Sequence, residues 1–367
     1  MSDCSYYRNE RTKQIDFETY ITTDNMNPNR GGIVEVETLP NVKTVTKYLP
    51  NDILISNIRP YFKKIWFANR EGGCSNDVLV VTAKPNVIPE FLYYVLSDNN
   101  FFNYDNITSK GTKMPRGTPN AIMKYLVPNI GKRKQAQIVS ILSSYDNLIE
   151  VNNKRIKMLE RMAENLYKEW FVRFRFPGHE SVEFENGIPK GWEIKRIGGI
   201  SSIKAGGDRP EVFSDSPIDG VSVPIFSNGI ENEGLYGFTD KPVITGESVT
   251  ISARGTVGYV CLRRIPYVPI VRLIAIVPDI SVITPLYLYY YLQRDSVIAN
   301  GTSQQQITVP MVSRKRIIVP SMAIMGKFGT VEQPIWNEMD KLRGQNRNLI
   351  QQRYLLLPRL MSGKLVV

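Results

Sequence analysis

The apolar pattern is most regular between Lys132 and Phe171, where about forty residues contain neither Pro nor Gly. Apolar side chains recur there at steps of three and four, at Ile138, Leu142, Tyr145, Ile149, Ile156, Leu159, Ala163, Leu166 and Trp170. This spacing places them on one narrow seam, while Lys, Arg, Glu and Asn occupy the other faces. The pattern predicts one helix of about 60 Å. An ordinary buried helix is the alternative, but the narrow seam favours a spacer helix that pairs with another helix.

Short β-branched and aromatic runs predominate before this helix, in residues 1–128. They predict strands at VEVETL (34–39), DILISNI (52–58), KKIWFA (63–68) and VLVVTA (78–83). A helix is expected from Pro89 to Leu96, because Pro is favoured in the first turn of a helix. A loop rich in Gly and cations follows at 109–118, and the segment ends with an expected strand, KYLVP, at 124–128. These features indicate a mixed, strand-rich domain.

After a connector that contains Pro and Gly, the order of segments in the first half returns. Four short segments recur in the same order, the first two with an offset of 196 residues: Ile55-Ser56 as Ile251-Ser252, Pro89–Leu96 as Pro285–Leu292, Gly111-Thr112 as Gly301-Thr302, and Val127-Pro128 as Val319-Pro320. Each match alone is weak. Their common order and near-constant offset indicate that the two halves of the chain are pseudo-repeats.

The second half also closes with a helical pattern, from Pro334 to Leu357, and Pro334 is expected to start or kink this helix. The predicted division is domain, helix, domain and helix, at residues 1–128, 129–176, 177–320 and 321–367. Amides interrupt the two apolar seams at Asn152 and Asn346. Because an amide in a seam fixes helix register at some cost in stability, we expect both near the middle of an antiparallel pair.

The excess of basic residues indicates the kind of partner that the chain binds. The chain of 367 residues carries 46 Lys and Arg against 35 Asp and Glu, a formal net charge of +11, which favours a polyanionic partner. Its apolar runs are interrupted by charges, as by Arg272, so neither a signal peptide nor a membrane span is predicted. The three cysteines are widely separated, which predicts neither a disulfide framework nor a Cys-x-x-Cys metal site and favours a reducing cytoplasm.

Catalytic motifs are missing from the sequence. It contains no Gly-x-x-x-x-Gly-Lys-[Ser/Thr] loop for ATP and no Asn/Asp-Pro-Pro-aromatic run of the sort found in amino-methyltransferases. His179 is the sole histidine, which excludes a zinc site built on several imidazoles and disfavours a Cys/His nucleophile pair. Glu193 and Lys195 could form part of a nuclease site, but no further carboxylates can be assembled there to hold Mg²⁺.

Three segments resemble the specificity subunit of type I restriction-modification systems: Leu166–Phe171, Pro189–Glu193 and Leu357–Leu365. The resemblance covers essentially the whole chain. It implies an α+β fold in which two target recognition domains are joined by two long antiparallel coiled-coil spacer helices. Each domain would read one half of a split double-stranded DNA target, and the helices would dock two methyltransferase subunits and the restriction subunits.

The same resemblance implies a noncatalytic chain without a cofactor of its own, since S-adenosylmethionine, ATP and Mg²⁺ would belong to the partner subunits. A coiled-coil scaffold whose two domains bind proteins is the alternative, which the net charge disfavours. One departure concerns the amino terminus: Met1 corresponds to Ile197, so nothing in the first repeat matches Pro189–Glu193. We expect either a longer true amino terminus or a shorter first domain whose edge strand comes from elsewhere.

Candidate DNA-binding residues lie after the strands and in the polar loops of both repeats. In the first repeat they are Arg59, Lys63, Lys64, Lys110, Lys113 and Arg116; in the second they are Arg254, Ser303, Gln304, Gln305, Gln306 and Arg314. Arginine pairs with guanine or phosphate, whereas glutamine suits the N6/N7 edge of adenine. Solvated turns that contact nothing are the alternative for these loops.

Overall fold

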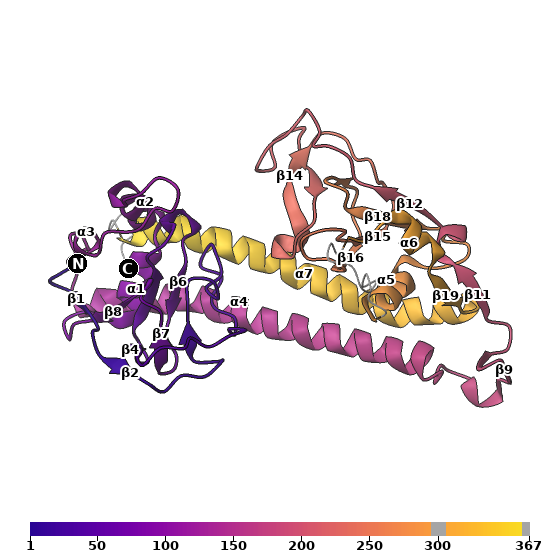
Figure 1. Cartoon of the computed structure of the whole chain (residues 1–367), viewed down its shortest axis with the longest axis horizontal. Coiled ribbons are helices and arrows are strands. Elements are labelled where there is room, and N and C mark those ends of the chain that lie inside the picture. The colour runs from indigo at the N-terminus through magenta and orange to yellow at the C-terminus, as the bar shows by residue number, and fades with distance from the viewer. Residues whose placement is uncertain (295–305, 362–367) are drawn as a thin grey trace. The chain divides into compact units, whose positions relative to one another are not determined.

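The computed structural model describes residues 1–294 and 306–361, which form two compact units. The first unit contains Met1–Lys154 and the segment that begins at Leu342, and the second contains Arg155–Lys341. Two long helices, α4 (Lys132–Tyr167) and α7 (Met322–Met361), each contribute one part to the first unit and the other part to the second (Figure 1). The expected long helix at Lys132–Phe171 is therefore confirmed, with a π-helical turn, η2 (Lys168–Val172), at its end.

The first unit is built on two four-stranded sheets. The first sheet has the order β1 (Ser5–Tyr7), β8 (Val78–Ala83), β5 (Ile53–Ser56) and β6 (Ile65–Phe67), with every pair antiparallel. The second has the order β2 (Arg11–Thr12), β4 (Val45–Tyr48), β7 (Gly72–Cys74) and β3 (Tyr20–Ile21), with only the last pair parallel. The helices of the first unit are α1 (Pro89–Ser97), α2 (Asn99–Thr108), α3 (Pro119–Ile122), the amino-terminal part of α4 and the carboxy-terminal part of α7.

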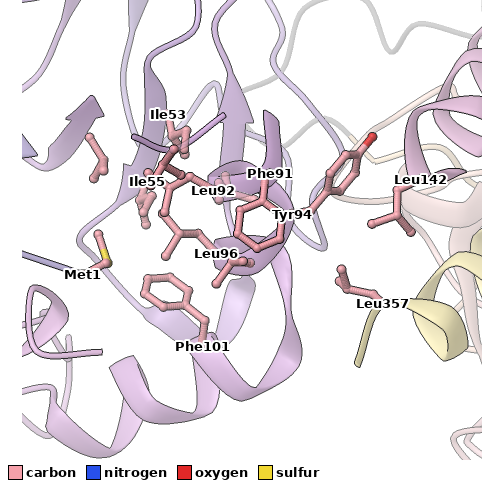
Figure 2. Close-up of a cluster of buried hydrophobic side chains, with 14 of the residues drawn as sticks. Met1, Ile53, Ile55, Phe91, Leu92, Tyr94, Leu96, Phe101, Leu142 and Leu357 are labelled. Carbon is pink, nitrogen blue, oxygen red and sulfur yellow. The ribbon is translucent and has the colours of Figure 1, made fainter. Parts of the chain in front are cut away.

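The core of the first unit lies between its first sheet and the helices (Figure 2). Ile53 and Ile55 of the sheet face Phe91 of α1, and Leu142 of α4 and Leu357 of α7 belong to the same buried cluster. Fully burying one such side chain contributes about 1.5–3 kcal/mol, so the helix ends are part of this core rather than attachments to it. The helix expected at Pro89–Leu96 is confirmed as α1.

The second unit repeats the first sheet of the first unit. Its four strands have the order β12 (Ser201–Ala205), β18 (Ile274–Pro278), β15 (Ser248–Ile251) and β16 (Val260–Arg263), again all antiparallel. The other elements are α5 (Pro285–Arg294), α6 (Val309–Arg314), the sheet β14 (Leu235–Thr239)–β13 (Val223–Phe226)–β17 (Val268–Pro269), the pair β9 (Phe184–Glu185)–β10 (Ile188–Pro189) and the pair β11 (Glu193–Arg196)–β19 (Arg316–Val319). The shared strand order confirms the internal duplication.

Within the first unit α4 and α7 run antiparallel. Leu142 shares a core with Leu357, Asp146 accepts a hydrogen bond from the Arg353 guanidinium, and Asn152 Nδ2 donates to Asn346 Oδ1 at 2.9 Å. Residue numbers that rise along α4 thus meet numbers that fall along α7. Both seam amides are buried, and Asn346 Nδ2 also donates to Asn153 Oδ1 at 2.8 Å.

Three expectations about elements are wrong. The carboxy-terminal helix begins at Met322 rather than at Pro334, because Met325 and Phe328 are buried in the second unit and Pro334 lies on an exposed face. The segment 34–39 is not a strand, and its Val34 and Leu39 side chains are exposed. The segment 124–128 is also not a strand: its counterpart β19 pairs with β11, and the described residues of the first repeat form no strand equivalent to β11. Instead the Met1 ammonium donates to the Tyr125 carbonyl at 2.6 Å.

Candidate nucleic-acid interface

The first part of the interface is the loop between β5 and β6, residues 57–64. It contains a short 3₁₀ turn, η1 (Pro60–Phe62), flanked by Arg59 and Lys63 with φ of 51° and 52°. Such positive φ values are uncommon for residues other than glycine and cost free energy, so the surrounding contacts must hold this conformation. Two of the candidate cations are therefore presented in fixed backbone positions.

A second loop, residues 109–117, is hydrogen-bonded to the first. Arg59 N donates to the Pro115 carbonyl at 2.8 Å, and Gly117 N donates to the Asn57 carbonyl at 3.0 Å. The backbones of Lys110 and Arg116 exchange two hydrogen bonds of 2.9 Å, which close this second loop on itself. The structure thus brings the candidate cations of both loops of the first repeat to one end of the sheet.

The cations in these loops differ in how they are held. Lys63 Nζ donates to Asn99 Oδ1 at 2.9 Å, and Lys64 Nζ donates to the Thr23 carbonyl at 2.6 Å. Lys110 and Lys113 are exposed, as is Arg116, whose Nη2 lies 3.3 Å from Asp77 Oδ1. An exposed ion pair of this kind contributes about 0–1 kcal/mol, so a phosphate can compete for Arg116.

A third loop, around Arg30, was not predicted. Asn29 N and Arg30 N donate to the carbonyls of Phe62 and Lys63 at 2.8 and 3.0 Å. The Arg30 guanidinium donates to Asn99 Oδ1 at 2.9 Å and lies 4.9 Å from the centre of the Tyr354 ring on α7. The signal in the sequence was the run Asn29-Arg30-Gly31-Gly32, which is typical of a turn, but the contact with α7 comes only from the fold.

A buried carboxyl lies beneath the junction of the first two loops. Asp105 of α2 is fully buried, and neither of its oxygens has a hydrogen-bond partner among the residues that the structure describes. Burial raises the pKa of Asp105 to about 7. A Cβ atom added to Gly117 would lie 2.6 Å from Asp105 Oδ1 and 2.8 Å from Asn57 Oδ1, so glycine is required for this close approach.

The second unit repeats the arrangement of the two loops. Ser252 N donates to the Tyr259 carbonyl at 2.9 Å, as Ser56 N donates to the Lys64 carbonyl at 3.1 Å. Ile307 N donates to the Ala253 carbonyl at 3.1 Å, which matches the bond between Gly117 and Asn57. The hairpin loop 253–258 is therefore joined to the segment that precedes α6 in the same way.

Two of the candidates in the second repeat are in contact: Arg254 Nη2 donates to Gln306 Oε1 at 3.2 Å. Ser303, Gln304 and Gln305 lie outside the described residues. Arg314 is exposed at the other end of α6, where Ile197 N donates to the carbonyl of the next residue, Lys315, at 2.9 Å. The structure therefore places Arg314 away from the end of α6 that adjoins Arg254.

Sequence reasoning also missed Arg263, which is buried at the end of β16. Its guanidinium donates to Thr250 Oγ1 at 3.0 Å and to the Glu233 carbonyl at 2.6 Å, and it lies 3.7 Å from the centre of the Phe226 ring. These contacts hold Glu233 in a left-handed conformation, with φ of 56°. Asn228 Oδ1 accepts a hydrogen bond from Ala253 N at 2.7 Å and so links this turn to the Arg254 loop.

Across residues 1–294 and 306–361, no group of three or more His, Cys, Asp or Glu side chains is placed to hold a metal ion. None of the helices in this described part combines the length and the apolar character required to span a bilayer.

Comparison with known proteins gives a consistent result. The family model described as the type I restriction modification DNA specificity domain matches residues 5–161 and 189–356. The MjaIX type I restriction enzyme specificity subunit of Methanocaldococcus jannaschii is 27% identical over an alignment of 316 positions, gaps included, which covers 78% of this chain and 71% of the relative. The HindI specificity subunit of Haemophilus influenzae is 23% identical over an alignment of 399 positions, gaps included, which covers 86% of each chain.

One solved structure supports the fold. The crystal structure of the S subunit of a type I restriction-modification system from M. genitalium aligns with a TM-score of 0.57 and 16% identity. The alignment covers 98% of this chain and 94% of that one.

Proposed function

Because this chain belongs to the family of type I restriction modification DNA specificity domains, we propose that its two units read the two halves of one split DNA target. The chain is a specificity subunit, as its relatives from two organisms are named, and we propose that it is the noncatalytic part of its restriction-modification enzyme. Its two matches to the family model follow the two repeats of the sequence. Double-stranded DNA also suits the net charge of +11.

One observation supports this location for the DNA-binding surface. In each unit the same backbone hydrogen bond joins a cation-bearing hairpin loop to a second loop: Gly117 to Asn57 in the first, Ile307 to Ala253 in the second. Both loops lie at the equivalent end of an equivalent sheet. A duplicated surface that presents cations is what the reading of a two-part DNA site requires.

The two surfaces differ in chemistry. The first presents mainly cations, which suit phosphates and the O6/N7 edge of guanine. In the second, Arg254 donates one hydrogen bond to Gln306 Oε1, which has a second lone pair, so the Gln306 amide keeps both an acceptor and a donor for a base. Glutamine pairs with the N6/N7 edge of adenine, so the second half-site is proposed to contain an adenine at this position.

The protein partners are inferred from the family and not from the two loop surfaces. We propose that α4 and α7 act as spacer helices and as the docking site for two methyltransferase subunits and the restriction subunits. S-adenosylmethionine, ATP and Mg²⁺ then belong to those subunits. A protein-binding scaffold is the competing hypothesis, and salt dependence separates the two, because only phosphate contacts release counterions on binding.

The test compares a triple variant, Lys110→Ala, Lys113→Ala and Arg116→Ala, with the control Lys157→Ala on an exposed face of α4. Each lost phosphate contact reduces the slope of log Kd against log salt by about 0.9, so we expect a reduction of up to about 2.7. The control should leave the slope unchanged. If the triple variant binds duplex DNA with an unaltered slope and affinity, this loop is not part of the DNA-binding surface.

A further inference from the structure

An exposed aromatic pair occupies the tip of the hairpin loop in the first unit. Tyr61 is 47% exposed and Phe62 is 38% exposed, and their ring centres lie 4.7 Å apart with the planes tilted by 55°. Single exposed apolar residues are common on protein surfaces and need no explanation. Two adjacent rings on a strained loop tip are different, because burying an aromatic side chain is among the largest gains available on folding or binding.

The turn that carries these rings is held from several sides. Pro60 is buried, and η1 is closed by hydrogen bonds from Phe62 N to the Arg59 carbonyl at 3.0 Å and from Lys63 N to the Pro60 carbonyl at 2.9 Å. The loop at Asn29 also donates to the Phe62 carbonyl. Since the backbone is already ordered, a ligand that buries the two rings does not have to order the loop.

Positive charge surrounds the pair. Arg59 and Lys63 flank the turn, and Lys64 Nζ lies 5.7 Å from the centre of the Phe62 ring. The second loop, with Arg116, is hydrogen-bonded to the same hairpin. A ligand that suits both the exposed rings and the surrounding cations must present flat apolar faces with negative charges beside them. Nucleic acid has this composition, because each base is bordered by phosphates.

The equivalent hairpin loop of the second unit has no such pair. This loop carries Gly255-Thr256-Val257-Gly258 in place of the aromatic turn, with φ of 69° at Gly255 and 88° at Gly258. The two loops otherwise share the closing hydrogen bond and the bond to the following loop. The aromatic tip is thus a property of the first surface alone, and its effect on DNA should be confined to one half-site.

We propose that Tyr61 and Phe62 form an aromatic wedge that stacks against a base step of the first half-site and opens it. This inference rests on the proposed function, since it requires the hairpin loop to face DNA. Apolar side chains that enter a base step unstack it partially and kink the duplex, at a cost of a few kcal/mol that the new contacts offset. The first half-site would then be read partly through the ease with which one of its steps opens.

The test uses the full chain with its methyltransferase subunits and a duplex that carries the methylated target. 2-Aminopurine replaces one base at a time across both half-sites, because its fluorescence rises when it unstacks. The wedge variant is Tyr61→Ala with Phe62→Ala, and the matched control is Tyr61→Phe with Phe62→Tyr, which keeps both rings. Thermal unfolding of each variant checks that the two substitutions leave the fold intact.

Stacking on an aromatic side chain contributes about 1–3 kcal/mol per base, so the wedge variant should bind about 5- to 150-fold more weakly. Its salt slope should match that of the unmodified chain, since no charge is lost. The fluorescence rise in one half-site should disappear in the wedge variant and persist in the ring-preserving control. A wedge variant that keeps either its affinity or its fluorescence rise overturns the inference.

Two further outcomes are distinct. If the wedge variant binds DNA normally but no longer copurifies with the methyltransferase subunits, the rings contact protein and the wedge is wrong. If the triple variant of Lys110, Lys113 and Arg116 leaves DNA binding unaltered while the wedge variant loses its fluorescence rise, the wedge stands and the cationic loop is wrongly assigned.

Discussion

At the scale of single residues, the carboxyl of Asp105 is held in an environment that opposes its charge. It is fully buried under the two loops of the first unit, and burial raises its pKa to about 7. A carboxyl with a raised pKa binds its proton more tightly in the folded chain than in the unfolded one. Its destabilising effect is therefore absent below the unfolded pKa near 3.8, grows as pH rises, and is complete above about 7.

We expect Asp105→Asn to stabilise the chain increasingly between pH 4 and pH 8, by up to about 4 kcal/mol at the upper end. Asparagine keeps the shape and removes the charge. Urea unfolding at pH 4, 6 and 8 measures this difference. Asp16→Asn is the control with the opposite sign, because hydrogen bonds from Thr19 lower the pKa of the exposed Asp16 carboxyl. Equal effects of Asp105→Asn at pH 4 and pH 8 would show that Asp105 is not held neutral.

Gly117 is the second residue on which the junction depends. A Cβ atom there would meet Asp105 Oδ1 at 2.6 Å and Asn57 Oδ1 at 2.8 Å, so Gly117→Ala must displace these side chains at the junction of the two loops. We expect a loss of about 1–3 kcal/mol in unfolding free energy together with weaker DNA binding. Gly246→Ala is the matched control, because nothing lies within 4 Å of its added Cβ. If both variants bind DNA as the unmodified chain does, the spacing of the loops does not matter for binding.

Some of these residues could be predicted from the sequence, and others could not. Arg59 and Arg116 follow a strand or lie in a glycine-rich loop, and both patterns are local, so their positions could be predicted. Arg30 and Asp105 act through contacts with segments far along the chain, with Tyr354 and Gly117. Local pattern carries no information about such contacts. That DNA is bound by any of the named side chains stays a prediction.

At the scale of elements, the pair α4–α7 depends on two buried amides. Asn152 Nδ2 donates to Asn346 Oδ1 within an otherwise apolar seam, and Asn346 Nδ2 donates to Asn153 Oδ1. Removing one partner leaves a buried polar group without its bond, whereas removing both leaves an apolar seam. The single substitution is therefore expected to lower the stability of the chain, and the double substitution is expected to raise it.

We expect Asn152→Leu alone to cost about 1–3 kcal/mol and the double change with Asn346→Leu to raise the melting temperature. The double variant should also lose its single register. Thermal unfolding measures the first effect, and spin labels at Lys154 and Arg347 measure the second as one distance or several. A double variant with one sharp distance would show that the amides do not determine register.

Strands were predicted correctly where a β-branched or aromatic run also has a neighbouring strand with which to pair. The strands expected at 52–58, 63–68 and 78–83 correspond to β5, which is buried along its whole length, and to β6 and β8, which are partly buried in the same sheet. The segments 34–39 and 124–128 have strand-like composition but no pairing partner. Helix α7 begins earlier than Pro334 suggests, because burial of Phe328 outweighs the hydrogen bond that proline removes.

At the scale of the whole molecule, the second unit is one continuous segment, Arg155–Lys341, with a sheet equivalent to that of the first. Replacing residues 185–320 by the corresponding segment of another family member should therefore change one half of the methylated target and preserve the other. Sequencing of methylated positions in cells that carry the exchanged chain and its methyltransferase subunits measures both halves. Exchange of residues 1–128 is the reciprocal control. A change in both halves after either exchange would exclude independent reading.

The first unit is discontinuous, and this has a consequence for how it is made. Ile138 and Leu142 bury their side chains against Leu357 and Leu360, which leave the ribosome about 200 residues later. At typical rates of about 5–20 residues per second, the nascent chain waits roughly 10–40 s with that part of its core uncovered. The second unit also joins distant residues, since Phe171 packs against Phe328, but its last residue, Lys341, emerges before Leu357 and Leu360. The later-encoded unit can therefore complete its fold first. During synthesis, the earlier-encoded unit remains open to a chaperone or to the same helix of another nascent copy.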